Sequence, residues 1–83
     1  MVKLNNIEKY KKVFMETFNV KEDKLKNNLE YDSIPEWDSV GHMTMVAALE
    51  EAFDIVLEMD DIIDFSSFNY GKEILKKYEI EIK

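Results

Sequence analysis

The chain has 83 residues, of which 46% are hydrophobic and 35% charged, and its formal net charge is −7. A chain of this length can bury one hydrophobic core, so we expect a single domain over residues 1–83 without a deep enzymatic cleft. It contains no cysteine, which excludes disulfides, thiolate metal sites and a cysteine nucleophile, and suits a reducing compartment. Residues 1–12 lack the apolar centre of a signal peptide, and no segment is apolar enough to span a membrane, so we expect a cytoplasmic protein.

Charge is unevenly distributed along the chain. Residues 30–64 carry eleven acidic residues and no lysine, whereas residues 1–29 carry seven lysines and four acids, and residues 65–83 carry four lysines and three acids. The acidic block repels nucleic acid and anionic lipid and attracts a basic partner at modest salt. Solubility is the simpler explanation for an acidic surface, and the position of the block in the chain favours a partner instead.

The first predicted helix covers residues 6–18, where apolar side chains recur three and four positions apart on one face: Leu4, Ile7, Tyr10, Val13, Phe14 and Phe18. Asn5 is a suitable N-cap, and Glu8 occupies the acidic position of a capping box. Residues 19–38 have no steady period and include the only proline. They predict a long loop that packs on the core through its large apolar residues, with Trp37 as the anchor.

A second long helix is predicted from Ser39, with Asp38 as its N-cap. Its inner face is expected to present Met43, Val46, Leu49 and Phe53. Residues 53–57 predict a buried connector, and residues 59–63 one or two short turns. Ser66 or Ser67 then caps a last helix with the inner face Phe68, Gly71, Ile74, Leu75 and Tyr78, and residues 78–82 predict a frayed end. The fold class is therefore all-α, a four-helix bundle with three longer helices, one short helix and a long loop between the first two.

This order of elements, together with Asp38-Ser39-Val40 at a helix start, resembles the acyl carrier protein family, which typically has Asp-Ser-Leu here. The resemblance covers almost the whole chain and includes residues 43–53, which are similar to the second helix of the family. Family members often carry other residues at the two positions after Val40. Gly41-His42 therefore resembles a specialised, stand-alone, bacterial-type carrier.

The resemblance implies an acyl-carrier-like bundle in which a phosphopantetheinyl transferase attaches 4′-phosphopantetheine from coenzyme A to Ser39. Asp38 would cap the helix and be recognised by the transferase. The thiol of the arm would hold an acyl group as a thioester, in agreement with a chain that has no cysteine. Such a protein is not an enzyme. It is expected to be a monomer that serves acyl-loading and acyl-transfer enzymes with basic patches.

The residues around Ser39 can also be judged by their own chemistry. A serine in the first turn of a helix is exposed near the positive end of the dipole, where a phosphodiester is favoured. Gly41 costs about 1 kcal/mol relative to alanine in a helix; it gives clearance to the arm or a partner, permits close packing of the loop, or is incidental. His42 either lies near the arm or packs against the loop. A Ser-His-Asp triad is not expected, because Asp38 adjoins the serine instead of lying behind the histidine.

The predicted partner-binding residues are small or acidic: Val40, Glu50, Glu51, Asp54, Asp60 and Asp61. The run from Asp60 to Asp64 matches the DDxxD pattern of magnesium-dependent prenyl-diphosphate enzymes. That chemistry needs a large helical cavity and a second metal-binding element, so we expect no metal site here.

Further apolar residues either form a cleft for an acyl chain or are simply core: Met43, Met45, Val46, Leu49, Ile62 and Phe68. Two other functions stay open. One is an aminoacyl or D-alanyl carrier with the same arm, and the other is an acidic helical interaction domain in which Ser39 stays unmodified. The sequence does not identify the cargo or the pathway.

Overall fold

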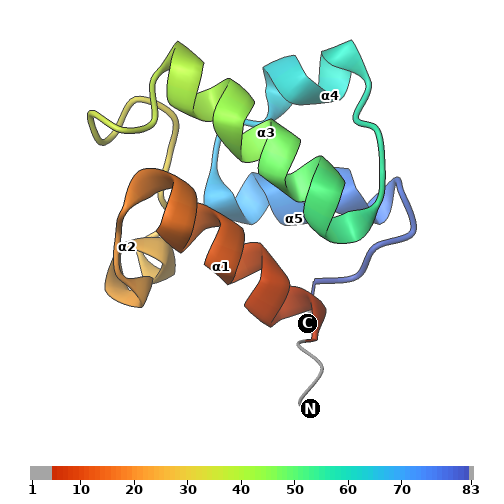
Figure 1. Cartoon of the computed structure of the whole chain (residues 1–83), viewed down its shortest axis with the longest axis horizontal. Helices are drawn as coiled ribbons and strands as arrows, with labels where there is room; N and C mark the ends of the chain where they lie inside the picture. The colour runs from red at the N-terminus through yellow and green to blue at the C-terminus, as the bar shows by residue number, and fades with distance from the viewer. Residues whose placement is uncertain (1–4, 83) are drawn as a thin grey trace.

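The helices of the chain surround one aromatic core. The computed structural model describes residues 5–82, which form five α-helices and no strand: α1 (Asn6–Phe18), α2 (Glu22–Lys26), α3 (Ser39–Phe53), α4 (Met59–Asp64) and α5 (Phe68–Lys76). α1 and α3 lie side by side, α5 lies behind them, and α4 sits beside α3 on the side away from α1 (Figure 1). The all-α class and the three longer helices are confirmed, but there are two short helices where one was predicted.

Helix α1 begins and ends where its apolar period predicts. The Asn5 side chain accepts a hydrogen bond from the Glu8 backbone N–H at 3.0 Å, as expected of an N-cap. The helix ends at Asn19, which adopts the left-handed conformation with φ 53° that asparagine tolerates better than most residues. Leu4, predicted to extend the apolar face, lies outside the described residues.

The segment 19–38 is not entirely a loop, because it contains α2. Acidic Glu22 opens this helix and pairs with Lys11 of α1 at 3.0 Å, and the pair lowers the pKa of Glu22. Leu25 is the buried residue of α2. A five-residue helix with one buried side chain shows no period, so hydrophobic spacing could not reveal it.

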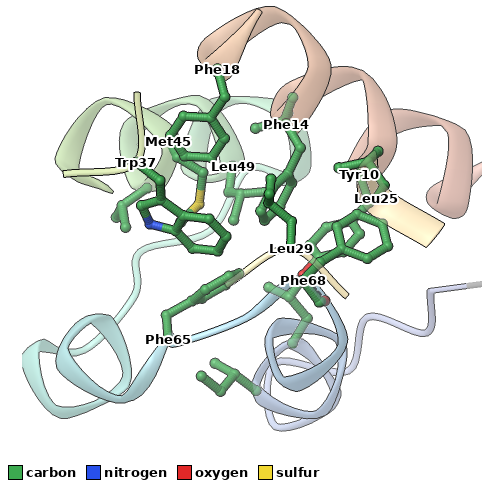
Figure 2. Close-up of a cluster of buried hydrophobic side chains, with 14 of the residues drawn as sticks. Tyr10, Phe14, Phe18, Leu25, Leu29, Trp37, Met45, Leu49, Phe65 and Phe68 are labelled. Atoms are coloured by element: carbon green, nitrogen blue, oxygen red, sulfur yellow. Dashed lines mark hydrogen bonds between the residues drawn. The ribbon is translucent and has the colours of Figure 1, made fainter. Parts of the chain in front are cut away.

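Phe14 lies at the centre of the core. Its ring centroid is 5.0 Å from that of Phe68, 5.5 Å from that of Trp37 and 6.1 Å from that of Phe65. Figure 2 shows how these rings, contributed by α1, the loop before α3 and the segment around α5, face one another. Pairs of this geometry contribute about 0.5–1.5 kcal/mol beyond the burial of their area. The aromatic side chains therefore join elements that make few direct helix-to-helix contacts.

Gly71 on α5 allows the rings of Tyr10, from α1, and Phe65, which follows α4, to approach the helix. A Cβ at this position would overlap the Tyr10 hydroxyl and Phe65 Cζ, and would lie 2.5 Å from Phe65 Cε1. The Tyr10 hydroxyl reaches past Gly71 to donate a hydrogen bond to the Phe68 carbonyl at 2.6 Å, and burial raises the pKa of Tyr10 well above its ordinary value. The prediction that Gly71 belongs to the inner face of the last helix is confirmed.

Two predictions of buried residues, one for the inner face of α3 and one for the connector after it, are wrong in part. Met43 is 52% exposed and does not join the core, whereas its neighbour in the sequence pattern, Met45, is fully buried. In the connector after α3, Leu57 is buried but Val56 is 82% exposed. Of the two candidate caps for the last helix, Ser67 is the one used, because its hydroxyl accepts the Tyr70 N–H at 3.0 Å.

The predicted frayed end is also wrong. α5 ends at Lys76, so Tyr78 lies beyond the helix, and the chain turns back toward the start of α1 (Figure 1). The Ile80 N–H donates to the Leu75 carbonyl at 3.1 Å, and the Asn6 side chain donates to the Glu81 carbonyl at 2.9 Å. Alternating isoleucines let this tail cover the core without a partner strand.

The prediction that Asp61 is one of the partner-binding acids is wrong. Asp61 is buried, with only 4% of its surface exposed. It forms an ion pair with Lys77 and accepts a hydrogen bond from the Tyr78 hydroxyl at 2.5 Å. The same hydroxyl accepts the Glu58 N–H at 2.9 Å. These bonds fasten α4 to the segment after α5. The hydrogen bonds from Lys77 and then Tyr78 lower the pKa of Asp61 below its ordinary value.

The first prediction concerns Gly71. The Gly71→Ala variant should lose about 1–3 kcal/mol of unfolding free energy, because an added methyl must displace two packed rings. Urea unfolding measures the loss. Asn69→Ala, an exposed change in the same helix, should stay within about 0.5 kcal/mol of the wild type. Equal stabilities for the two variants would contradict the close approach.

The second prediction concerns pH. Because the pKa of Asp61 is lower in the folded chain than in the unfolded chain, its contribution is complete above about pH 4 and is lost as the pH falls further. Asp61→Asn should cost about 1–2 kcal/mol at pH 6, and the difference from the wild type should shrink below pH 4. Asp60→Asn, an exposed neighbouring change, should show neither effect. A pH-independent difference for Asp61→Asn would refute this account.

Candidate functional site

The segment before α3 is fixed by Trp37, whose side chain is fully buried. Its ring stacks on Phe18 of α1 with the centroids 5.0 Å apart and the planes 20° apart. Its backbone carbonyl accepts the Asp32 N–H at 2.9 Å, which closes the turn that precedes the helix. The predicted role of Trp37 as the anchor of this loop is confirmed.

Asp38 caps α3, as predicted. Its Oδ1 accepts the Gly41 N–H at 2.8 Å and its carbonyl accepts the His42 N–H at 2.8 Å. Ser39 is therefore the first residue of the helix. Its side chain is exposed and makes no hydrogen bond among the described residues. The site thus presents a free hydroxyl at the positive end of a 15-residue helix.

Gly41 faces the loop and not the solvent. A Cβ here would overlap the Glu36 carbonyl oxygen and would lie 3.3 Å from Phe18 Cε1. Of the three interpretations offered by the sequence, close packing of the loop is the one the geometry supports. The clearance interpretation is not supported, because the space a side chain would occupy is filled by the chain's own backbone.

His42 has both ring nitrogens engaged. Nδ1 accepts the hydrogen bond of the Trp37 indole N–H at 2.9 Å, and Nε2 lies 2.7 Å from the Ile62 carbonyl. An indole N–H only donates and a carbonyl only accepts, so this pattern requires the neutral ring with the proton on Nε2. His42 connects the loop, α3 and the end of α4. It is not free to act as a base for Ser39, so the structure offers no Ser-His-Asp triad.

An apolar groove lies beside Ser39, between α3 and α4. It has a volume of about 360 Å³ and is open to solvent. The lining residues come from the loop, α3, α4 and the segment after α4: Tyr31, Ser39, His42, Met43, Met59, Ile62, Ile63, Phe65 and Ser66. Along its rim Met43, Met59 and Ile63 are 52%, 68% and 70% exposed. Apolar side chains are therefore exposed together next to the free hydroxyl.

The residues predicted to form a cleft divide into two groups. Met43 and Ile62 line the groove, whereas the others belong to the buried core: Met45, Val46, Leu49 and Phe68. The sequence missed Tyr31, Met59, Ile63 and Ser66 as groove residues. Met59 and Ile63 are four positions apart and share a helix face, but the sequence predicted only one or two short turns there and did not indicate which side chains are exposed.

The predicted partner-binding residues do not form one surface. Val40 and Asp60 are exposed, and each directly follows a groove residue in the sequence, Ser39 and Met59 respectively. Glu51 and Asp54 are exposed toward the opposite end of α3 from Ser39, which a helix of this length places roughly 20 Å away. Glu50 is half-buried and its Oε2 accepts the Leu57 N–H at 2.9 Å, so it holds the connector.

Residues 5–82 contain neither a candidate metal site nor a candidate membrane span. No group of three or more acidic, histidine or cysteine side chains in this range is arranged to hold a metal ion. None of the helices described here is long and apolar enough to cross a membrane. Comparison of the chain with protein-family models, curated proteins and solved structures gives no match. The geometry around Ser39 therefore carries the functional argument.

The third prediction concerns Gly41. Gly41→Ala should lose about 1–3 kcal/mol of unfolding free energy, because the added methyl meets backbone that cannot rotate away. Val40→Ala, at the exposed preceding position, is the matched control and should change stability by less than about 0.5 kcal/mol. Thermal unfolding monitored by Trp37 fluorescence measures both. A Gly41→Ala protein as stable as the wild type would show that the loop does not press against α3.

Proposed function

We propose that this protein is an acyl carrier with an acyl-carrier-like helical bundle, modified with 4′-phosphopantetheine on Ser39. The observation that carries the proposal is an exposed serine hydroxyl at the first position of α3, beside an open apolar groove that the same serine lines. The resemblance of Asp38-Ser39-Val40 to the acyl carrier protein motif supports the same function.

The residues fit a phosphodiester at Ser39. The hydroxyl is exposed and free of internal hydrogen bonds among the described residues, so a transferase can reach it. The backbone N–H groups of Ser39 and Val40 lie at the positive end of α3, where they favour a phosphate. Asp38 is occupied as the cap through Oδ1, and the rest of its carboxylate is exposed for recognition by the transferase. When attached, the arm supplies a thiol that holds the acyl group as a thioester.

The surroundings of Ser39 suit partner enzymes with basic, partly apolar surfaces. Val40 and the groove rim offer apolar contacts, and exposed Asp60 and Asp64 add negative charge beside them. No lysine occurs between residues 30 and 64, so a basic partner meets no like charge on this part of the chain. A freely diffusing monomeric carrier matches these features. An aminoacyl or D-alanyl cargo would use the same arm and the same serine.

A second candidate is an interaction domain with an unmodified Ser39. The exposed apolar rim of the groove, flanked by carboxylates, is the observation that favours it. Modification of Ser39 separates the two candidates.

The fourth prediction is that a broad-specificity phosphopantetheinyl transferase, with coenzyme A and magnesium, adds the mass of one phosphopantetheine to the wild type. Ser39→Ala should gain nothing. Ser66→Ala is the matched control, because Ser66 also lines the groove and is exposed, and this variant should be modified like the wild type. Intact-mass spectrometry measures all three.

The parallel modification of an established carrier protein shows that the transferase is active. An unchanged mass for the folded wild type under those conditions would rule out the carrier and favour the interaction domain. Modification of Ser39→Ala would show that the attachment site lies elsewhere.

A further inference from the structure

The inner wall of the groove beside Ser39 is formed by packed aromatic rings. Phe65, which lines it, is buried, and the His42 ring stands against Phe65 with the centroids 6.3 Å apart. The Trp37 ring stacks on the other side of the His42 ring, with the ring centroids 6.2 Å apart and the planes 16° apart. Trp37 itself stacks on Phe18. Figure 2 shows that Met45 lies beside Trp37, between Phe18 and Leu49. A ligand in the groove therefore meets a layer of aromatic rings instead of an opening into the core.

The hydrogen bonds of His42 hold this layer closed. The Ile62 carbonyl, near the end of the six-residue helix α4, accepts a long hydrogen bond from the Phe65 N–H at 3.4 Å, and His42 Nε2 donates to it from α3 at the shorter distance of 2.7 Å. The other nitrogen holds the indole of Trp37. Movement of α4 away from α3 would leave the carbonyl with only this long hydrogen bond and the His42 Nε2–H without a partner, which is unfavourable inside a protein.

Helix α4 is also held from its other side. Buried Asp61 pairs with Lys77 and Tyr78, and the Tyr78 hydroxyl accepts the Glu58 N–H. α4 is thus fixed to α3 through His42 and to the segment after α5 through Asp61. The groove can adapt at its rim, where the flexible side chains of Met43 and Met59 are exposed, but not at its inner wall.

We propose that His42 is a positioning residue that latches α4 against α3 and thereby limits the cargo to a short apolar acyl group, which lies in the open groove while any longer chain stays in solvent. This inference rests on the proposed carrier function. It makes the ring at position 42 the determinant of cargo length.

The fifth prediction tests the latch without the transferase. The chain has no cysteine, so Ser39→Cys creates a single attachment point at the groove, and alkyl methanethiosulfonates can add methyl, hexyl or tetradecyl groups to it. The hexyl group should raise the unfolding midpoint by about 5 °C over the methyl group, because the groove buries it. The tetradecyl group should raise it no further. Glu73→Cys, exposed on α5 away from the groove, should show no dependence on chain length.

The role of His42 is tested by adding His42→Ala to Ser39→Cys. With the latch removed, the tetradecyl group should stabilise the protein more than the hexyl group does. His42→Leu removes both hydrogen bonds but keeps an apolar side chain next to Phe65, and it serves as the second variant should His42→Ala not fold. Equal midpoints for the two chains in these variants would overturn the assignment to His42.

A larger midpoint for tetradecyl than for hexyl in the Ser39→Cys protein with His42 intact would overturn the length limit itself. Methyl resonances report the same event independently. The hexyl group should shift the signals of Met43 and Met59 and leave that of buried Met45 unchanged. Because the alkyl groups are attached chemically, failure of the length limit is distinct from failure of the carrier function, which would appear as an unmodified Ser39.

Discussion

The hydrogen bond between the Trp37 indole and His42 is the interaction on which the site depends. A fully buried indole N–H needs an acceptor inside the protein. His42 supplies the acceptor from the first turns of α3. The loop that ends at Trp37 and the helix that begins at Ser39 are therefore fixed relative to each other, and Asp38 between them is placed to cap the helix.

Two further constraints follow from this contact. The loop backbone lies so close to α3 that only glycine fits at position 41, where the Glu36 carbonyl fills the space of a side chain. The proton that His42 keeps on Nε2 is directed at α4. One side chain thus sets the approach of the loop on one side and of the short helix on the other. Ser39 projects from the rigid junction of these elements, which keeps its hydroxyl exposed without a mobile loop.

The sequence predicts the elements whose period or cap is strong. The bounds of α1, the start of α3 and the caps Asn5 and Asp38 follow from spacing and from side chains that can bond a backbone N–H. The errors occur where long-range contacts decide. Asp61 is predicted as a surface acid, because the sequence does not show its contacts with the distant residues Lys77 and Tyr78. Residues 78–82 are predicted as a frayed end, because the sequence does not show that Asn6 of α1 bonds the Glu81 carbonyl.

The sequence was sufficient to predict the reactive serine of the site, but not the groove beside it. Asp-Ser at a helix start identifies the free hydroxyl, because both roles depend on residues within one turn. The groove needs four separate segments, and its exposed rim includes Met43, which the helical period places in the core, and Met59, which the sequence assigns only to a short turn. Exposure of such residues is unfavourable in water unless something covers them for part of the time. These exposed side chains lie next to Ser39. We therefore infer that they are covered either by an acyl group that Ser39 carries or by a partner protein that binds at this site.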